Sequence, residues 1–128
     1  MSWLVSQPAD EHPAERLRGM LAAGDPIVAP GEFNPLVALM ARKTGFSAAY
    51  FSGAAFSASL GLPDVGLFTL DELATAVRWT VRASGLPLIV DGDTGFGEAL
   101  NVVRTVRELE DAGAAAVHLE DQEMPKRC

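Results

Sequence analysis

The chain has 128 residues, of which 48% are hydrophobic and 21% are charged, a balance typical of one soluble globular domain. Its formal charge of −7 offers no basic surface for nucleic acid or an anionic membrane, and no apolar run approaches the roughly 20 residues that span a bilayer. Without a basic segment and apolar core at its start, it is expected to be cytoplasmic.

Four short apolar runs predict strands, and four longer segments with apolar residues at helical spacing predict helices. The expected strands cover residues 27–29, 48–51, 87–90 and 115–119. The expected helices cover residues 13–23, 36–44, 70–83 and about 102–112. Because the strands are nearly continuous in apolar residues and alternate with helices, the fold class is α/β, with a parallel sheet covered by helices.

Capping residues mark where two of these helices begin. Asn34 and Pro35 predict an N-cap and a first-turn proline, and Thr69 with Glu72 predicts a capping box. Residues 52–66 are rich in small side chains and are expected to form a long loop. No linker divides the chain, which is interpreted as a leading helix within residues 1–24 and a strand–helix repeat over residues 25–128.

Polar residues follow the predicted strands, where parallel α/β proteins collect their chemistry. Asp91 and Asp93 would leave an extended backbone on the same side, roughly 6.5 to 7 Å apart along it, and could share one Mg²⁺ ion with help from Glu120 through a water molecule. The same two aspartates could equally cap the next helix or solvate a loop. Spacing alone therefore leaves the metal site open.

Three further groups of residues have two interpretations each. Ser52 and Gly53 could offer a hydroxyl and backbone N–H groups to an anionic substrate, or could serve tight packing. His118 lies inside an apolar run and is expected to be a core or barrel-interior histidine. A single cysteine, Cys128, excludes an internal disulfide and a multi-cysteine zinc site; nearby Lys126 would favour its thiolate, although an inert terminal cysteine is also compatible.

Five blocks of sequence carry a resemblance. They are Tyr-Phe-Ser-Gly-Ala-Ala (50–55), Ser-Leu-Gly-Leu-Pro-Asp (59–64), Asp-Gly-Asp-Thr-Gly-Phe-Gly (91–97), Ala-Gly-Ala-Ala-Ala-Val-His-Leu-Glu-Asp-Gln (112–122) and Pro-Lys-Arg-Cys (125–128). In this order and spacing they resemble the isocitrate lyase and phosphoenolpyruvate mutase superfamily, and the 2-methylisocitrate lyase group most closely. The resemblance covers the chain from about Leu17 onward.

The resemblance implies a (β/α)₈ TIM barrel with Mg²⁺ or Mn²⁺ at its carboxyl-terminal mouth, a small-molecule carboxylate as substrate and a homotetramer. Because such a barrel needs about 250 residues and eight βα units, the chain is expected to be an N-terminal half barrel carrying the first four units. We expect it to be inactive alone, poorly folded, or rescued only by association.

The resemblance also assigns residue roles. The metal-site residues would be Asp91, Asp93, Asp64 and Glu120. The residues lining the substrate pocket would be Tyr50, Ser52, Gly53, Ala54 and Asp91. The catalytic residues would be Cys128, Lys126 and Tyr50, with Cys128 as the general acid in carbon–carbon cleavage and Tyr50 a weak candidate for the base, which the sequence does not assign.

The implied reaction is cleavage of 2-methylisocitrate, or of a similar 2-hydroxy tricarboxylate, to pyruvate and succinate. Two alternatives remain at this point. One is an enzyme of the same superfamily that acts as a phosphoenolpyruvate or carboxyphosphonoenolpyruvate phosphonomutase, or as an oxaloacetate decarboxylase; Cys128 disfavours the mutases. The other is a non-catalytic half barrel that docks on a complete subunit.

Overall fold

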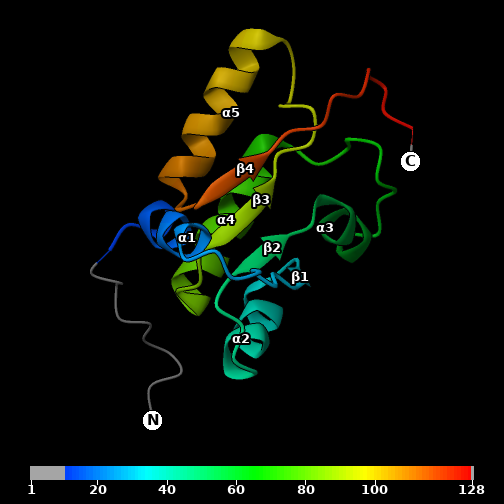
Figure 1. Ribbon diagram of the computed structural model, residues 1–128. Helices are drawn as coiled ribbons and strands as arrows, with labels where there is room; N and C mark the ends of the chain where they lie inside the picture. Colours follow the sequence, from blue (N-terminus) through cyan, green and yellow to red (C-terminus); the bar gives the residue numbers. More distant parts are fainter. Residues whose placement is uncertain (1–10, 128) are drawn as a thin grey trace.

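The computed structural model describes residues 11–127 and consists of one parallel sheet with helices packed against it (Figure 1). The four strands are β1 (Gly31–Glu32), β2 (Ala49–Phe51), β3 (Leu88–Asp91) and β4 (Ala116–His118). They pair in sequence order, all in parallel, so that β1 and β4 form the edges. The expected α/β class with a parallel sheet is confirmed.

Five helices connect or precede the strands. They are α1 (Pro13–Ala22), α2 (Pro35–Lys43), α3 (Gly53–Ser59), α4 (Leu70–Ser84) and α5 (Ala99–Asp111). Helix α4 packs against α2 on one side and α5 on the other, whereas α3 lies beyond the end of β2 (Figure 1). Within the described residues, no helix combines the length and apolar character that a bilayer crossing requires.

The predicted capping signals form as expected because each acts within one helical turn. The Asn34 side chain accepts a hydrogen bond from the Val37 N–H at 3.0 Å, which fixes the start of α2. At α4, the Thr69 hydroxyl accepts from the Glu72 N–H while the Glu72 carboxylate accepts from the Thr69 N–H, which completes the capping box. Gly85 ends α4 in the left-handed conformation, at φ 63°.

The first strand differs from the prediction. Strand β1 begins at Gly31, after the apolar run 27–29, and Val28 in that run is 65% exposed. Pairing with β2 starts where the Tyr50 N–H donates to the Pro30 carbonyl at 3.0 Å. Pro30 has no N–H of its own to donate. The apolar run therefore leads into the edge strand instead of forming it.

The expected loop over residues 52–66 was wrong for its first half, which is helix α3. The Ser52 hydroxyl caps this helix by accepting from the Ala55 N–H at 3.2 Å, and small residues then continue the helix. Phe56 anchors α3, since its ring lies 5.5 Å from that of Phe51 and 5.2 Å from that of Phe68. Aromatic packing outside the helix thus stabilises a segment that looked irregular.

The two faces of the sheet have different roles. Phe51, Leu88 and Val90 are fully buried beneath the helices, and each such side chain contributes roughly 1.5 to 3 kcal/mol of hydrophobic stabilisation. Tyr50 and Ile89 alternate with them and are only partly buried. Asp91 follows Val90 and therefore lies on the same face as Tyr50. This face carries the polar residues described next.

Candidate metal and substrate site

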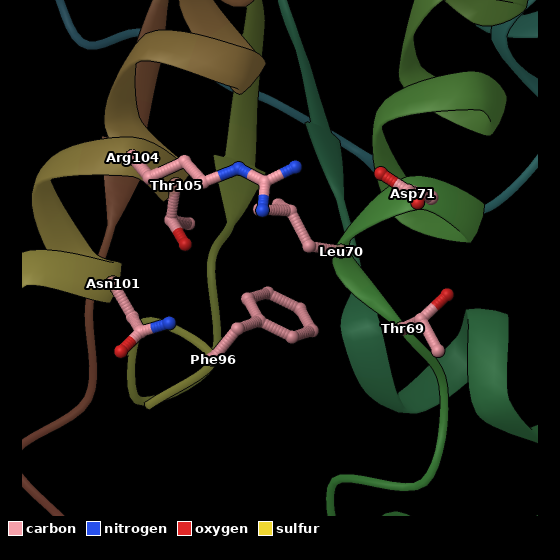
Figure 2. A pocket seen from close by; sticks show the side chains of 7 residues that line it. All are labelled: Thr69, Leu70, Asp71, Phe96, Asn101, Arg104 and Thr105. Carbon is pink, nitrogen blue, oxygen red and sulfur yellow. The ribbon is translucent and has the colours of Figure 1, made fainter. Parts of the chain in front are cut away.

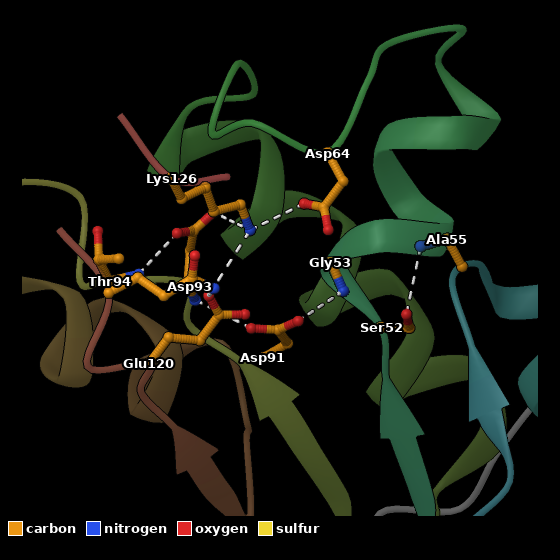
Figure 3. Close-up of polar contacts among 10 residues, drawn as sticks. Ser52, Gly53, Ala55, Asp64, Asp91, Asp93, Thr94, Glu120 and Lys126 are labelled. Atoms are coloured by element: carbon orange, nitrogen blue, oxygen red, sulfur yellow. Dashed lines mark hydrogen bonds and ion pairs between the residues drawn. The ribbon is translucent and has the colours of Figure 1, made fainter. Parts of the chain in front are cut away.

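A cluster of acidic side chains lies beyond the carboxyl ends of β2, β3 and β4 (Figure 3). It contains Asp91 at the end of β3, Asp93 two residues later, Asp64 from the segment after α3 and Glu120 after β4. Lys126 lies among them. The sheet thus brings together all four residues that the resemblance assigned to a metal site.

Asp91 is held by two backbone N–H groups. Its Oδ2 accepts from the Gly53 N–H at 3.2 Å, and its Oδ1 accepts from the Asp93 N–H at 3.0 Å. A β-carbon at Gly53 would lie 2.9 Å from Asp91 Oδ2, so only glycine allows this approach. The start of α3 and the end of β3 are therefore joined through one carboxylate.

The backbone turns sharply at Asp93, which corrects the expectation of an extended Asp91–Asp93 segment. Asp93 has φ 52°, in the left-handed region that Asp tolerates better than most residues. Its Oδ1 accepts from the Thr94 N–H at 2.7 Å, and its carbonyl accepts from the Glu120 N–H at 2.8 Å. The turn aims the Asp93 carboxylate at the loop after β4, away from a simple side-by-side arrangement with Asp91.

The Lys126 ammonium is the point on which three carboxylates converge. Its Nζ lies 2.8 Å from Asp64 Oδ1, 3.0 Å from Asp93 Oδ2 and 3.9 Å from Glu120 Oε2, while its side chain is only 2% exposed. Burial alone would lower the pKa of Lys126, but the Asp64 and Asp93 carboxylates outweigh burial and raise it. The ammonium is therefore charged at neutral pH.

The donor chemistry of this cluster suits Mg²⁺ or Mn²⁺. The groups that would reach a cation here are carboxylate oxygens, which hard divalent ions prefer, and they already surround a cation in the form of Lys126. As they stand in residues 11–127, no three His, Cys, Asp or Glu side chains are arranged as a ligand set. The residue types thus fit a hard divalent ion, and the Lys126 ammonium lies between the Asp64 and Asp93 carboxylates.

Gly92, between the two aspartates, permits the close contact of β3 with β4. A β-carbon there would lie 2.9 Å from Val117 Cγ1 and 3.2 Å from the His118 carbonyl oxygen. The Gly92 N–H donates to that same carbonyl at 2.8 Å. The glycine of the Asp-Gly-Asp sequence is therefore required by packing, a role that its flanking residues do not reveal.

Tyr50 and His118 form a polar pair on the same face of the sheet. The Tyr50 hydroxyl lies 3.1 Å from His118 Nδ1. Burial raises the pKa of the Tyr50 hydroxyl, and the charges of Asp91 and Glu120 raise it further. His118 is exposed, so the expected position in the core of this chain is wrong, while the alternative of a barrel-interior histidine stays a prediction. A raised pKa makes Tyr50 a proton-bearing group at neutral pH and argues against its use as a base.

The small residues after β2 are only partly available to a substrate. The Gly53 N–H is already used by Asp91. The Ser52 hydroxyl accepts from the Ala55 N–H, so it could still donate its own proton to a ligand. Ala54 is exposed in the first turn of α3. Cys128 lies outside the described residues, so its predicted catalytic role remains a prediction.

These features define the class: a parallel α/β protein with a buried acidic site at the carboxyl ends of its strands. The sequence model of the phosphoenolpyruvate phosphomutase family matches residues 17–127, and the chain belongs to that family. Its four strands with their helices correspond to half of the (β/α)₈ barrel that the superfamily adopts.

Relatives of known name are considerably longer than this chain. It is 55% identical to the 2-methylisocitrate lyase of Aeropyrum pernix and 50% identical to that of Bacillus subtilis; in each case all of the chain aligns, but it covers only 41% and 43% of the relative. A phosphonopyruvate hydrolase structure in complex with oxalate and Mg²⁺ superimposes with a TM-score of 0.87 at 37% identity, over 91% of the chain and 41% of the hydrolase.

Proposed function

We propose that this chain supplies the acidic half of the site of a Mg²⁺- or Mn²⁺-dependent carbon–carbon lyase. The substrate would be 2-methylisocitrate or a similar 2-hydroxy tricarboxylate, cleaved to pyruvate and succinate. Identity of 50% and more to two 2-methylisocitrate lyases supports the lyase reaction. The complete enzyme would be a cytoplasmic homotetramer. Because the chain covers less than half of those relatives, we expect it to have no turnover alone.

The observation that carries this proposal is the convergence of Asp64, Asp93 and Glu120 on one buried cation beside Asp91. Gathering that much negative charge around one point is unfavourable without a cation. A divalent ion at this point would polarise the carboxylate and hydroxyl oxygens of a bound substrate and stabilise the negative charge that develops during cleavage.

The residues around the cation have separable roles. Asp91 is fixed by the Gly53 and Asp93 N–H groups, so its carboxylate reaches the substrate or metal in one orientation. Asp93 and Glu120 are tied to each other through the backbone, which keeps β3 and β4 in register at the site. Lys126 neutralises the carboxylates while no metal is bound, and would be released toward the substrate when a metal binds.

The remaining groups would bind the substrate carboxylates. Tyr50, with its proton retained and its orientation fixed by His118, would donate a hydrogen bond to the pyruvate half of the substrate. Ser52 would donate its hydroxyl proton to the same carboxylate from the cap of α3. Cys128 would protonate the succinate fragment as it leaves.

Metal binding gives the direct test. We expect the chain to bind Mn²⁺, followed by electron paramagnetic resonance, and to release it to excess Mg²⁺. Asp93→Asn should weaken binding at least about tenfold, since it removes a charged ligand. Glu110→Gln, on the exposed surface of α5, serves as the matched control. Equal affinity of Asp93→Asn and the native chain would contradict the metal assignment.

Activity is tested by supplying the part of the barrel that this chain does not cover. The chain would be co-expressed with the part of the Bacillus subtilis relative that it does not cover, and pyruvate release from 2-methylisocitrate would be measured. We expect turnover only in the combined protein, and its loss in Asp93→Asn. The likeness to phosphonopyruvate hydrolase supports a second candidate, phosphonopyruvate chemistry. Turnover of phosphonopyruvate in place of 2-methylisocitrate would favour that candidate.

A further inference from the structure

A cavity of about 330 Å³ lies between the first turns of α4 and α5, away from the acidic site (Figure 2). Its lining residues are Thr69, Leu70, Asp71, Phe96, Asn101, Arg104 and Thr105. The volume is that of a small molecule, at the lower end of the range typical of ligand pockets. None of these residues takes part in the acidic site.

The two helices present opposite charges to this cavity. Arg104 extends its guanidinium from α5 toward α4, and Asp71 stands on the α4 side (Figure 2). Arg104 contacts Glu108 only through Nε, at 3.5 Å, which leaves the outer N–H groups of its fork for another acceptor. Among residues 11–127, Asp71 makes no ion pair. A simple anion would therefore face the Asp71 carboxylate, and a simple cation would face Arg104.

The rest of the wall combines apolar and polar side chains. The Phe96 ring and Leu70 provide its apolar surface, and Asn101 adds an amide from the α5 side, away from the Arg104 guanidinium (Figure 2). Phe96 has φ 60°, a left-handed conformation that is unusual for a bulky residue and stores backbone strain. Such strain persists only where the surroundings enforce it, and the Phe96 ring packs with its centroid 5.8 Å from that of Phe68.

We propose that this cavity binds a small zwitterion, such as a free α-amino acid, with its carboxylate on Arg104 and its ammonium on Asp71. The ligand side chain would lie on Phe96 and Leu70. A zwitterion carries charges complementary to both walls. The Phe96 ring favours a ligand with an aliphatic side chain, and the cavity is large enough to hold one.

A ligand in this cavity would affect the position of the loop that follows Asp93 in the acidic site. The Thr105 hydroxyl donates to the Gly95 carbonyl at 2.8 Å, and β-carbons at Gly95 and Gly97 would lie 2.5 Å from Val102 and 2.7 Å from Asn101. The first turns of α5 are therefore packed directly on the loop that follows Asp93. Phe96 also lines a second hollow, of about 320 Å³, whose wall includes Asp93.

The test uses three matched ligands and nuclear magnetic resonance of the ¹⁵N-labelled chain. L-Leucine is the zwitterion, 4-methylpentanoate lacks its ammonium, and 3-methylbutylamine lacks its carboxylate. We expect L-leucine to produce saturable shifts in the Asn101 side-chain amide and in the Asp71 and Thr94 backbone amides, with a Kd of roughly 1 mM or tighter. Each analogue should bind at least about tenfold more weakly.

Variants separate binding from a purely structural role. Arg104→Gln and Asp71→Asn should each lower the affinity for L-leucine at least about tenfold, whereas Arg107→Gln, exposed on the same helix, should not. Absence of saturable shifts would overturn the proposal, as would equal binding of either analogue. Loss of stability without loss of affinity in both variants would show that the pair is structural only. No metal or lyase substrate is needed, so failure here leaves the proposed function untouched.

Discussion

Two buried acidic residues, one at the end of β1 and one after β3, are accommodated in different ways. Asp93, after β3, is 4% exposed, and its carboxylate is compensated by the Thr94 N–H and by the Lys126 ammonium 3.0 Å away. Glu32, at the end of β1, is fully buried, and neither of its carboxylate oxygens has a hydrogen-bond partner among residues 11–127. Burial raises the pKa of Glu32 to about 8.

The difference shows how this fold tolerates buried acid. Around Asp93 the protein keeps the charge and supplies a cation, which preserves a site where a metal or substrate could exchange with that cation. At Glu32 the protein supplies no cation; burial outweighs the Asn34 backbone, and the carboxyl remains protonated at neutral pH. The charged carboxylates of the acidic site, in contrast, are compensated by Lys126 in the segment after β4.

Loss of the Lys126 ammonium is expected to have the largest effect on the free energy of unfolding. Lys126→Met leaves Asp64 and Asp93 with uncompensated negative charge, and we expect a loss of about 3 to 5 kcal/mol in the free energy of unfolding at pH 7. Urea denaturation followed by circular dichroism measures it. Lys43→Met, exposed at the end of α2, is the control and should lose far less. Similar losses in both variants would mean that the ion pairs contribute little.

The pH dependence of stability tests the neutral state of Glu32. Because the folded pKa of about 8 lies above the ordinary value of 4.5, the folded chain holds this proton over a range in which the unfolded chain has released it. Stability should therefore fall as pH rises from about 5 through 8, by about 4 kcal/mol, at roughly 1.4 kcal/mol per pKa unit over about three units.

Glu32→Gln isolates this contribution because glutamine does not titrate. The slope of unfolding free energy against pH between 5 and 9 should become smaller in the variant, so that its stability relative to the native chain improves at pH 9. An unchanged slope would show that Glu32 is ionised in the folded chain and has found a partner.

Gly53→Ala tests the packing around Asp91 in the acidic site without changing any charge. The new methyl group would lie 2.9 Å from Asp91 Oδ2 and must push the carboxylate or the start of α3 aside, at a cost of about 1 to 2 kcal/mol. Gly19→Ala, in α1 with open space around it, should instead stabilise by about 0.5 to 1 kcal/mol. Thermal unfolding of both variants measures the contrast; a neutral Gly53→Ala would contradict the close approach.

The smallest effect is expected at the sheet face. Tyr50→Phe removes the hydroxyl that lies 3.1 Å from His118 Nδ1 in a half-exposed pair, so about 0.5 to 1 kcal/mol should be lost. Chemical denaturation of the variant measures this loss. A larger loss, comparable with that of Lys126→Met, would show that Tyr50 belongs to the compensating network around Asp91.

Local signals predicted most of the fold. Asn34 and the Thr69–Glu72 pair act within three residues, so the sequence displays each complete cap. Helix α3 was missed because its stability comes from Phe56 packing on Phe51 and Phe68, and no run of apolar residues announces such contacts. The start of β1 was missed because an edge strand takes its limits from the partner strand.

The sequence predicted which acidic residues lie together beyond the strand ends, but not how they are arranged. The resemblance identified Asp64, Asp93 and Glu120, and polar residues at strand ends pointed to the same region. The left-handed turn at Asp93 and the position of the Lys126 ammonium depend on contacts between distant segments, which spacing does not encode. Glu32 follows the first apolar run in the sequence, and only its burial in the structure distinguishes it from an ordinary surface carboxylate.

The agreement between strand order and chain order has a consequence for how the molecule assembles. Each strand pairs with the one before it in the chain. The sheet can therefore form from β1 toward β4 during synthesis, because no strand must insert between two strands that are already paired. The β2–β3 pairing closes the longest connection, since α3 and α4 both lie within it. Pairing of β2 with β3 should therefore limit the folding rate, because the connecting segment loses conformational entropy before the contacts between the two strands form.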